Sequence, residues 1–260
     1  MGNLDGPQPG GFHFSLVRKA NFCYKNLEKR SGDYSVMGIK EFLGIKARPQ
    51  LDRILQGPRV KVRKFSREDL DKRSKWLPYE DPLYRHHNIY LPTTGMLDYW
   101  YKTWVNGRGR ISFAIDDEAD RMMGQISLRE IDWRGGVARL GISLASDAVG
   151  KGYGTEALRV FLRYYFGEMG FKRMVLDVAQ FNRRAIRCYE KLGFTVTRDF
   201  LRENTFGVRL TGNTRFRNIR RFFVIDQDCE WIKYLDMELT REKFLQDEAR
   251  TREKEDAEGS

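Results

Sequence analysis

The chain has 260 residues, of which 41% are hydrophobic, enough to bury one substantial core with appendages. Lysine and arginine total 47 against 36 aspartate and glutamate, and this formal charge of +11 favours anionic ligands such as a nucleotide or an acidic surface. Three widely spaced cysteines argue against a disulfide framework and a paired-cysteine metal site, and they predict a reducing, cytoplasmic setting. No apolar run approaches the roughly 20 residues that span a bilayer, so we expect no membrane contact.

The first segment, residues 1–57, is expected to be a basic and partly disordered N-terminal extension, because glycine and proline crowd its first ten or so residues. A folded domain should begin with the alternating strand at 58–65. Ser66 and Asp69 follow this strand as an N-cap pattern for a helix, and residues 97–101 predict a second helix.

Three apolar runs separated by turn residues predict an antiparallel meander over 111–115, 122–131 and 137–144. Further strands are expected at 174–178, from 195 onward, and at 229–239. The folded domain would therefore span 58–240. It includes a long insertion at 203–227 in which arginine alternates with phenylalanine, and a charged tail follows at 241–260.

The loop Gly150-Lys151-Gly152-Tyr153-Gly154-Thr155 follows the third of these strands and opens into a helix with an apolar stripe from Leu158 to Phe166. Three glycines in five positions let several backbone N–H groups turn toward one anion at a helix N-terminus. This arrangement suits a pyrophosphate.

A second helix signature runs from Asn182 to Phe194, after one intervening strand. Asn182 is a good N-cap and Gly193 predicts a Schellman stop, while Ile186, Tyr189 and Leu192 share one apolar face.

Together the two segments resemble the GNAT superfamily of acyl-CoA-dependent N-acetyltransferases, in the branch with ribosomal-protein N-terminal acetyltransferases and spermidine acetyltransferases. The resemblance implies an α/β GNAT fold: a mixed, mostly antiparallel twisted sheet flanked by helices, with a splayed strand pair that binds acyl-CoA. The family motif Gln/Arg-x-x-Gly-x-Gly/Ala falls on Val149 to Gly154. Val149 stands where the family often has Gln or Arg, so one side-chain contact to the cofactor is lost.

By the same resemblance, acetyl-CoA is the co-substrate and a primary amine attacks it directly. Tyr189 would face the thioester sulfur as the acid, because a phenol pKa of about 10 lies above the 8.5 of a thiol. Packing alone also explains Tyr189, and capping alone explains Asn182. The expected acetyl-CoA contacts are Ile142, Ser143 and Leu144 through backbone pairing, Val149, Gly150, Lys151, Gly152, Tyr153, Gly154 and Thr155 in the loop, and Asn182 at the pantetheine.

No residue stands out as the general base. The candidates by chemistry are Glu80, Asp81, Glu130, Asp132 and either His86 or His87. Two adjacent histidines without a third suitably spaced ligand do not make a metal site, so we predict no metal.

The acceptor is expected to be a protein N-terminus or a small amine such as a polyamine. The insertion at 203–227 corresponds to a segment that borders the acceptor site in this family, so its arginines either select an acidic acceptor or are simply solvated. A non-catalytic GNAT-fold module that binds acyl-CoA or a partner is the alternative. The basic extensions would allow contact with a protein or the ribosome, and a homodimer is also compatible with the sequence.

Overall fold

The computed structural model describes residues 51–88, 94–205, 214–226 and 229–258. They belong to one compact unit that starts at Pro49, while residues 1–50 of the expected extension lie outside the described part. Strand β1 (Leu55–Gln56) pairs with β2 (Val60–Lys64), and the expected boundary at residue 57 stays a prediction. No helix within the described ranges is long and apolar enough to cross a membrane.

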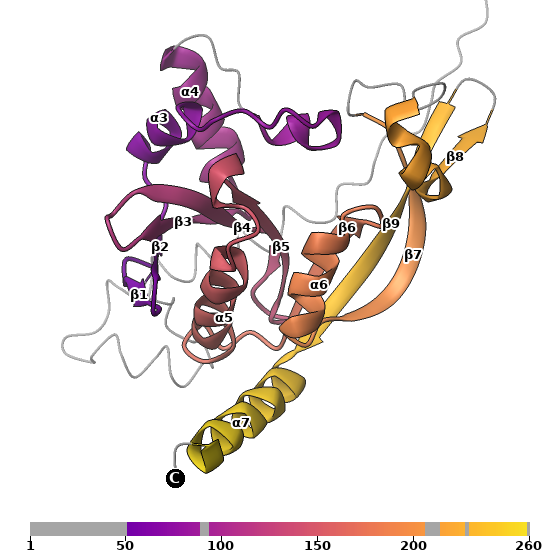
Figure 1. Ribbon diagram of the computed structural model, residues 1–260. Helices are drawn as coiled ribbons and strands as arrows, with labels where there is room; N and C mark the ends of the chain where they lie inside the picture. Colours follow the sequence, from indigo (N-terminus) through magenta and orange to yellow (C-terminus); the bar gives the residue numbers. More distant parts are fainter. Residues whose placement is uncertain (1–50, 89–93, 206–213, 227–228, 259–260) are drawn as a thin grey trace, which may run out of the picture. The chain divides into compact units, whose positions relative to one another are not determined.

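One twisted sheet organises this unit (Figure 1). Its strands follow the order β1-β2-β3-β4-β5-β6-β9-β7, and β8 also pairs with β9. Every pairing is antiparallel except the one between β5 and β6, so the predicted mixed, mostly antiparallel sheet is confirmed. The remaining strands are β3 (Ile111–Asp117), β4 (Met122–Asp132), β5 (Val137–Leu144), β6 (Arg173–Ala179), β7 (Thr195–Glu203), β8 (Phe223–Asp226) and β9 (Cys229–Thr240).

Helices cover both faces of the sheet. Successive side chains of a strand point to opposite faces, so neighbouring residues of one strand pack against different helices. Phe113 packs against Phe161 of α5 (Tyr153–Phe166), with ring centroids 4.9 Å apart. The neighbouring Ala114 instead joins a cluster with Leu70 of α3 (Glu68–Ser74) and Leu97 of α4 (Thr94–Trp100). Helix α6 (Arg183–Lys191) lies beside α5, and α7 (Arg241–Glu258) follows β9 (Figure 1).

The predicted N-cap pattern before α3 is only partly present. Asp69 accepts the Ser66 N–H at 2.8 Å, but no side chain caps the first turn. The buried Asp69 carboxylate is bound mainly by Arg63, at 2.7 and 2.8 Å. The pair thus ties α3 to strand β2.

The insertion after β7 contributes ordered structure next to β9. Its described part forms the 3₁₀ segment η4 (Thr214–Phe222) and β8. Phe216 and Phe222 of η4 share a second apolar cluster with Leu83 of the 3₁₀ segment η1 (Pro82–His87). Two chain segments far apart in sequence therefore meet beside the end of β6.

Strands β5 and β6 pair over three residues only, from Val137 with Arg173 to Arg139 with Val175. Beyond Arg139 they separate, so the predicted splayed strand pair is confirmed. The Ala145 N–H bonds the Met123 carbonyl of β4 at 2.7 Å, which fixes the alternation of the backbone groups. Gly141 and Ser143 therefore turn their backbone groups toward β4. Leu140, Ile142 and Leu144 turn theirs into the gap between β5 and β6, which we call the split.

Candidate active site

A cavity of about 650 Å³ follows the split, a usual size for a small-molecule site. Its walls come from η1, β4, β5, the glycine loop, β6, α6, β7 and β9. Of the residues predicted to contact acetyl-CoA or to act on it, Lys151 and Tyr153 do not line the cavity. Those that do are Ile142, Ser143, Leu144, Val149, Gly150, Gly152, Gly154, Thr155, Asn182 and Tyr189.

The glycine loop has the backbone conformation that an anion cradle needs. Gly150 and Gly152 have φ of +81° and +87°, a region that residues with a side chain rarely adopt. The N–H groups of Thr155 and Glu156 both bond back to the Gly152 carbonyl at 3.1 Å. The preceding amides, from Gly152 to Gly154, stand before the first intrahelical bond and can bind an anion.

Arg59, just before β2, supports this loop from outside the cavity. Its backbone N–H and its Nε donate to the Glu156 carboxylate at 2.5 and 2.9 Å, and its Nη1 donates to the Lys151 carbonyl at 3.4 Å. Its guanidinium also lies 4.9 Å from the centre of the Tyr153 ring. The Lys151 carbonyl and the Tyr153 ring therefore help to fix the loop.

Helix α6 is fixed at both ends, and this fixes the two predicted site residues that it carries. Asn182 accepts the Ala185 N–H at 3.2 Å as the N-cap. Gly193 has φ of +92°, and the Phe194 N–H bonds the Tyr189 carbonyl at 3.0 Å, which confirms the Schellman stop. The Tyr189 ring packs 5.8 Å from that of Phe194. Capping and packing thus coexist with exposure to the cavity.

The Tyr189 side chain is buried apart from the part that lines the cavity. Burial raises the pKa of its phenol well above the usual range, and negative charge on Cys188 and Asp177 acts in the same direction. Its hydroxyl makes no hydrogen bond to another residue of the described part. Tyr189 is therefore protonated at neutral pH, and its hydroxyl is available to donate a hydrogen bond within the described part.

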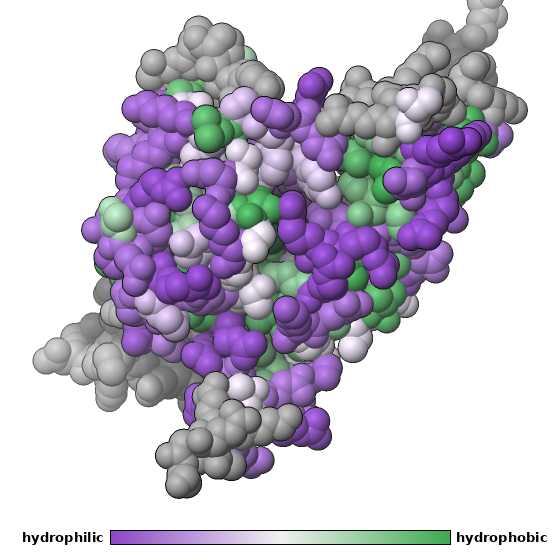
Figure 2. Space-filling model, viewed as in Figure 1, coloured by the Kyte–Doolittle hydropathy of each residue, from purple (hydrophilic) through white to green (hydrophobic). Residues whose placement is uncertain are grey.

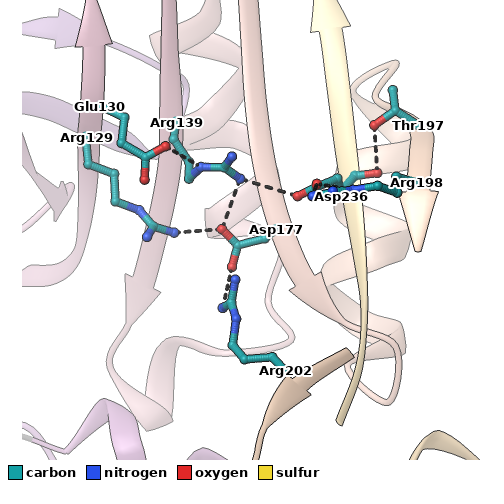
Figure 3. A network of polar contacts seen from close by, with 8 residues as sticks. All are labelled: Arg129, Glu130, Arg139, Asp177, Thr197, Arg198, Arg202 and Asp236. Atoms are coloured by element: carbon teal, nitrogen blue, oxygen red, sulfur yellow. Dashed lines mark hydrogen bonds and ion pairs between the residues drawn. The ribbon is translucent and has the colours of Figure 1, made fainter. Parts of the chain in front are cut away.

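A network of arginines and carboxylates crosses the sheet at the base of the split (Figure 3). Asp177 of β6 is 6% exposed and binds Arg129 of β4 at 2.9 Å, Arg139 of β5 at 3.2 Å and Arg202 of β7 at 2.9 Å. Burial alone would raise the pKa of Asp177, but these arginines outweigh it and hold that pKa below its ordinary value. Asp177 is therefore a poor proton acceptor at neutral pH.

The network lies on the sheet face that carries α3 and α4. Asp177 stands between Leu176 and Val178, and both of these belong to the core beneath α5 and α6. The same alternation puts Arg129 on the face opposite to Leu128. Because the cavity is lined by Arg129 and also by Tyr189 of α6, it passes through the sheet at the split.

Most of the candidate bases lie away from the cavity. Glu130 is exposed and pairs with Arg139 at 2.9 Å, and Asp132 accepts the N–H groups that form the turn after β4. Asp81 caps η1 through the Leu83 N–H at 3.0 Å, and Glu80 is exposed.

His87 does line the cavity, with its ring 5.6 Å from that of Tyr79, whereas the His86 side chain lies outside the described part. No three histidine, cysteine or acidic side chains within that part cluster as a metal site would.

Sequence reasoning missed most of the polar lining. Arg187 and Lys191 of α6 line the cavity on the side of the glycine loop, where Thr155 Oγ1 lies 3.1 Å from Cys188 Sγ. Hydrophilic side chains dominate the surface over α6 (Figure 2). The other missed residues are Tyr79, Tyr84, Arg129, Arg184, Arg202 and Tyr234. No local motif marks them, because the tertiary fold brings them together from η1 and the segment before it, α6 and three strands.

These residues fit acetyl-CoA. The glycine cradle and the cations of α6 suit a diphosphate, and the inward backbone groups of Leu140 and Ile142 suit the amide-rich pantetheine arm. The Leu144 carbonyl also points inward, where it accepts the Tyr79 hydroxyl at 2.8 Å. The fold and the chemistry of this cavity fit an acyl-CoA-dependent transferase.

Residues 59–195 match the acetyltransferase (GNAT) domain family. The chain belongs to this family, and its activity is acetyl transfer to an amine. It is 26% identical over 129 residues to a spermidine N(1)-acetyltransferase of Vibrio cholerae, covering 50% of this chain and 71% of that relative. A kanamycin resistance protein of Rhizobium radiobacter is 40% identical over 60 residues, 23% of this chain and 56% of that protein.

Solved structures show the same fold. The crystal structure of the Vibrio cholerae spermidine N-acetyltransferase in complex with CoA and spermine has a TM-score of 0.54 and 19% identity. The likeness covers 72% of this chain and 98% of that one.

Replacing Gly152 by alanine should weaken CoA binding about tenfold. A side chain at φ of +87° is strained by roughly 1–2 kcal/mol, and the new Cβ would lie 3.3 Å from Arg59 Nη2, which must move away slightly. The matched control is Gly95→Ala in α4, where a Cβ meets nothing within 4 Å. Isothermal calorimetry with CoA measures both. A folded Gly152→Ala protein with wild-type affinity would contradict the anion-cradle assignment.

Proposed function

We propose that the cavity at the split is where acetyl transfer takes place, with the diphosphate on the glycine loop and the pantetheine arm along β5. The observation that carries this proposal is the coincidence of three features in one cavity: the cradle at Gly150 and Gly152, the unpaired edge of β5, and the Tyr189 side chain. In this proposal Asn182 keeps its capping bond and turns its remaining polar atoms to the pantetheine.

Acetyl-CoA supplies a thioester whose carbonyl carbon forms the C–N bond with the neutral amine. The C–S bond breaks and leaves its electron pair on sulfur, while the nitrogen gives up one N–H proton to the base. Tyr189 then donates a hydrogen bond to that sulfur. Full proton transfer from a phenol of pKa about 10 to a thiolate of pKa about 8.5 costs about 2 kcal/mol, and burial of Tyr189 increases this cost. Tyr189 therefore stabilises the thiolate as a donor and keeps its proton.

The amine must be neutral before it attacks. At pH 7 this costs about 4.6 kcal/mol for an amine of pKa about 10.4 but only about 1 kcal/mol for an α-amino group of pKa about 7.8. The cations Arg129 and Arg202 in the cavity lower the pKa of a nearby ammonium by repulsion and so reduce this cost. His87 is the base that we propose, because it is the candidate that lines the cavity in the described part.

Replacing Tyr189 by phenylalanine should lower kcat about 100-fold and change the KM for acetyl-CoA less than about threefold. The ring keeps its packing against Phe194, and only the donor to the developing thiolate is lost. Release of free CoA thiol in the presence of a primary amine measures the rate. Tyr99→Phe, at a side chain that is 67% exposed, controls for handling of the variants. Wild-type kcat in Tyr189→Phe would remove the residue from the mechanism.

The pH dependence of kcat/KM should rise between pH 7 and 9 and show no descending limb below pH 10. The rise follows deprotonation of the amine. A raised pKa keeps the Tyr189 phenol protonated to higher pH, so the loss of this donor is displaced upward. Rates taken with circular dichroism at each pH separate catalysis from unfolding. A fall centred near pH 10, the ordinary pKa of a phenol, that is absent in Tyr189→Phe would mean that the phenol ionises normally.

A further inference from the structure

The lining of the cavity carries an excess of positive charge. Arg129 of β4, Arg202 of β7 and Arg184 of α6 all line it, and the one acidic side chain of the described lining is Asp177. That carboxylate already binds Arg129 and Arg202, and also Arg139 from outside the cavity (Figure 3). Asp177 therefore has little capacity left to bind a cationic ligand.

The guanidinium groups in this region are held in place by aromatic rings. Arg202 lies 4.3 Å from the centre of the Tyr234 ring, and Arg184 lies 5.4 Å from that of Tyr84. Arg184 forms no ion pair with any residue that the structure describes. Oriented guanidinium groups with unused N–H donors match a carboxylate, which can accept two of them at once.

Arg129 is too far from the glycine loop to serve its diphosphate. Arg129 pairs in register with Arg139, whereas Leu144, five residues further along β5, has its Cδ1 3.2 Å from where a Cβ of Gly154 would lie. At roughly 3.3 Å per residue, Arg129 is about 17 Å along the strand from the loop. The charge of Asp177 nevertheless reaches Tyr189 and contributes to its raised pKa. Asp177 and the two lining arginines bound to it, Arg129 and Arg202, therefore lie toward the Tyr189 end of the cavity.

We propose that the acceptor is a primary amine that itself carries a carboxylate, and that Arg129 and Arg202, with Arg184, bind this carboxylate. The proposal rests on the acetyl-transfer site described above and names its substrate class. A polyamine is cationic along its length and would meet three arginines with no uncommitted carboxylate among the described lining residues. The cavity thus suits the opposite charge to that of spermidine, the acceptor named for the Vibrio cholerae relative.

Three four-carbon amines that differ only in the far group test this proposal: 4-aminobutyrate, 4-aminobutyramide and 1,4-diaminobutane. Thiol release from acetyl-CoA gives kcat/KM for each. One charged hydrogen-bonded contact favours the carboxylate over the amide by about 10- to 100-fold, and the diamine should be the poorest acceptor. Preference for the diamine, or equal rates for all three, would overturn the proposal.

Variants of two arginines on β7 then test which residue causes the preference for a carboxylate. Arg202→Gln should lower kcat/KM for 4-aminobutyrate about 10- to 100-fold, change that for the amide less than about threefold, and leave the CoA affinity unchanged. Arg202→Lys should keep most of the preference. The matched control is Arg198→Gln, because Arg198 lies on the same strand, pairs with Asp236 at 2.6 Å and also stacks on Phe200, but does not line the cavity. A loss of CoA affinity in Arg202→Gln would instead assign this arginine to the cofactor.

A binding measurement distinguishes failure of the proposed acetyl transfer from failure of the proposed charge selectivity. If no amine is acetylated, the same three amines are titrated calorimetrically into the protein saturated with CoA. If only 4-aminobutyrate binds, the proposed charge selectivity of the cavity stands and the proposed acetyl transfer is wrong. Binding of the diamine, or of none of the three, would overturn the selectivity as well.

Discussion

The separation of β5 from β6 after only three paired residues is the constraint on which the rest of the site depends. A fully paired parallel strand would use every backbone group of Leu140 to Leu144 and leave no route through the sheet. Because the strands part, one edge of β5 is free for an extended ligand, and groups from both faces meet at its reacting end. The glycine loop lies between the end of β5 and the start of α5. One extended ligand can therefore contact both the free edge of β5 and the loop.

Charge holds this opening together. Arg129 and Arg139 stand opposite each other in register, as do Asp177 and Asp236, and either pair alone would be repulsive. Ion pairs across the strands let these arginines and aspartates neutralise one another. Arg198 and Arg202 from β7 also bind the two aspartates (Figure 3). The network bridges β4, β5, β6, β9 and β7 at the very place where the backbone hydrogen bonds between β5 and β6 stop.

The local parts of this site could be predicted from sequence because short-range rules define them. Gly150 and Gly152 require their positive φ, Asn182 caps α6, and Gly193 ends it. The contacts of Arg59 with Glu156 and of Arg129 with Asp177 could not be predicted, since they join residues 97 and 48 positions apart and depend on strand order. The extension at 1–50 and residues 206–213 of the insertion lie outside the described part, so their expected contacts with a protein, the ribosome or a second copy stay predictions.

Amide hydrogen exchange by NMR, with and without CoA, tests the split as the cofactor site most directly. The account predicts slower exchange at the loop amides of Gly152 to Gly154 and at Leu140 and Ile142, which face the split. It predicts little change at Gly141 and Ser143, whose amides already face β4. Equal protection of all four β5 amides would contradict the split as the cofactor site. Protection at another surface, with no change at the loop amides, would contradict it as well.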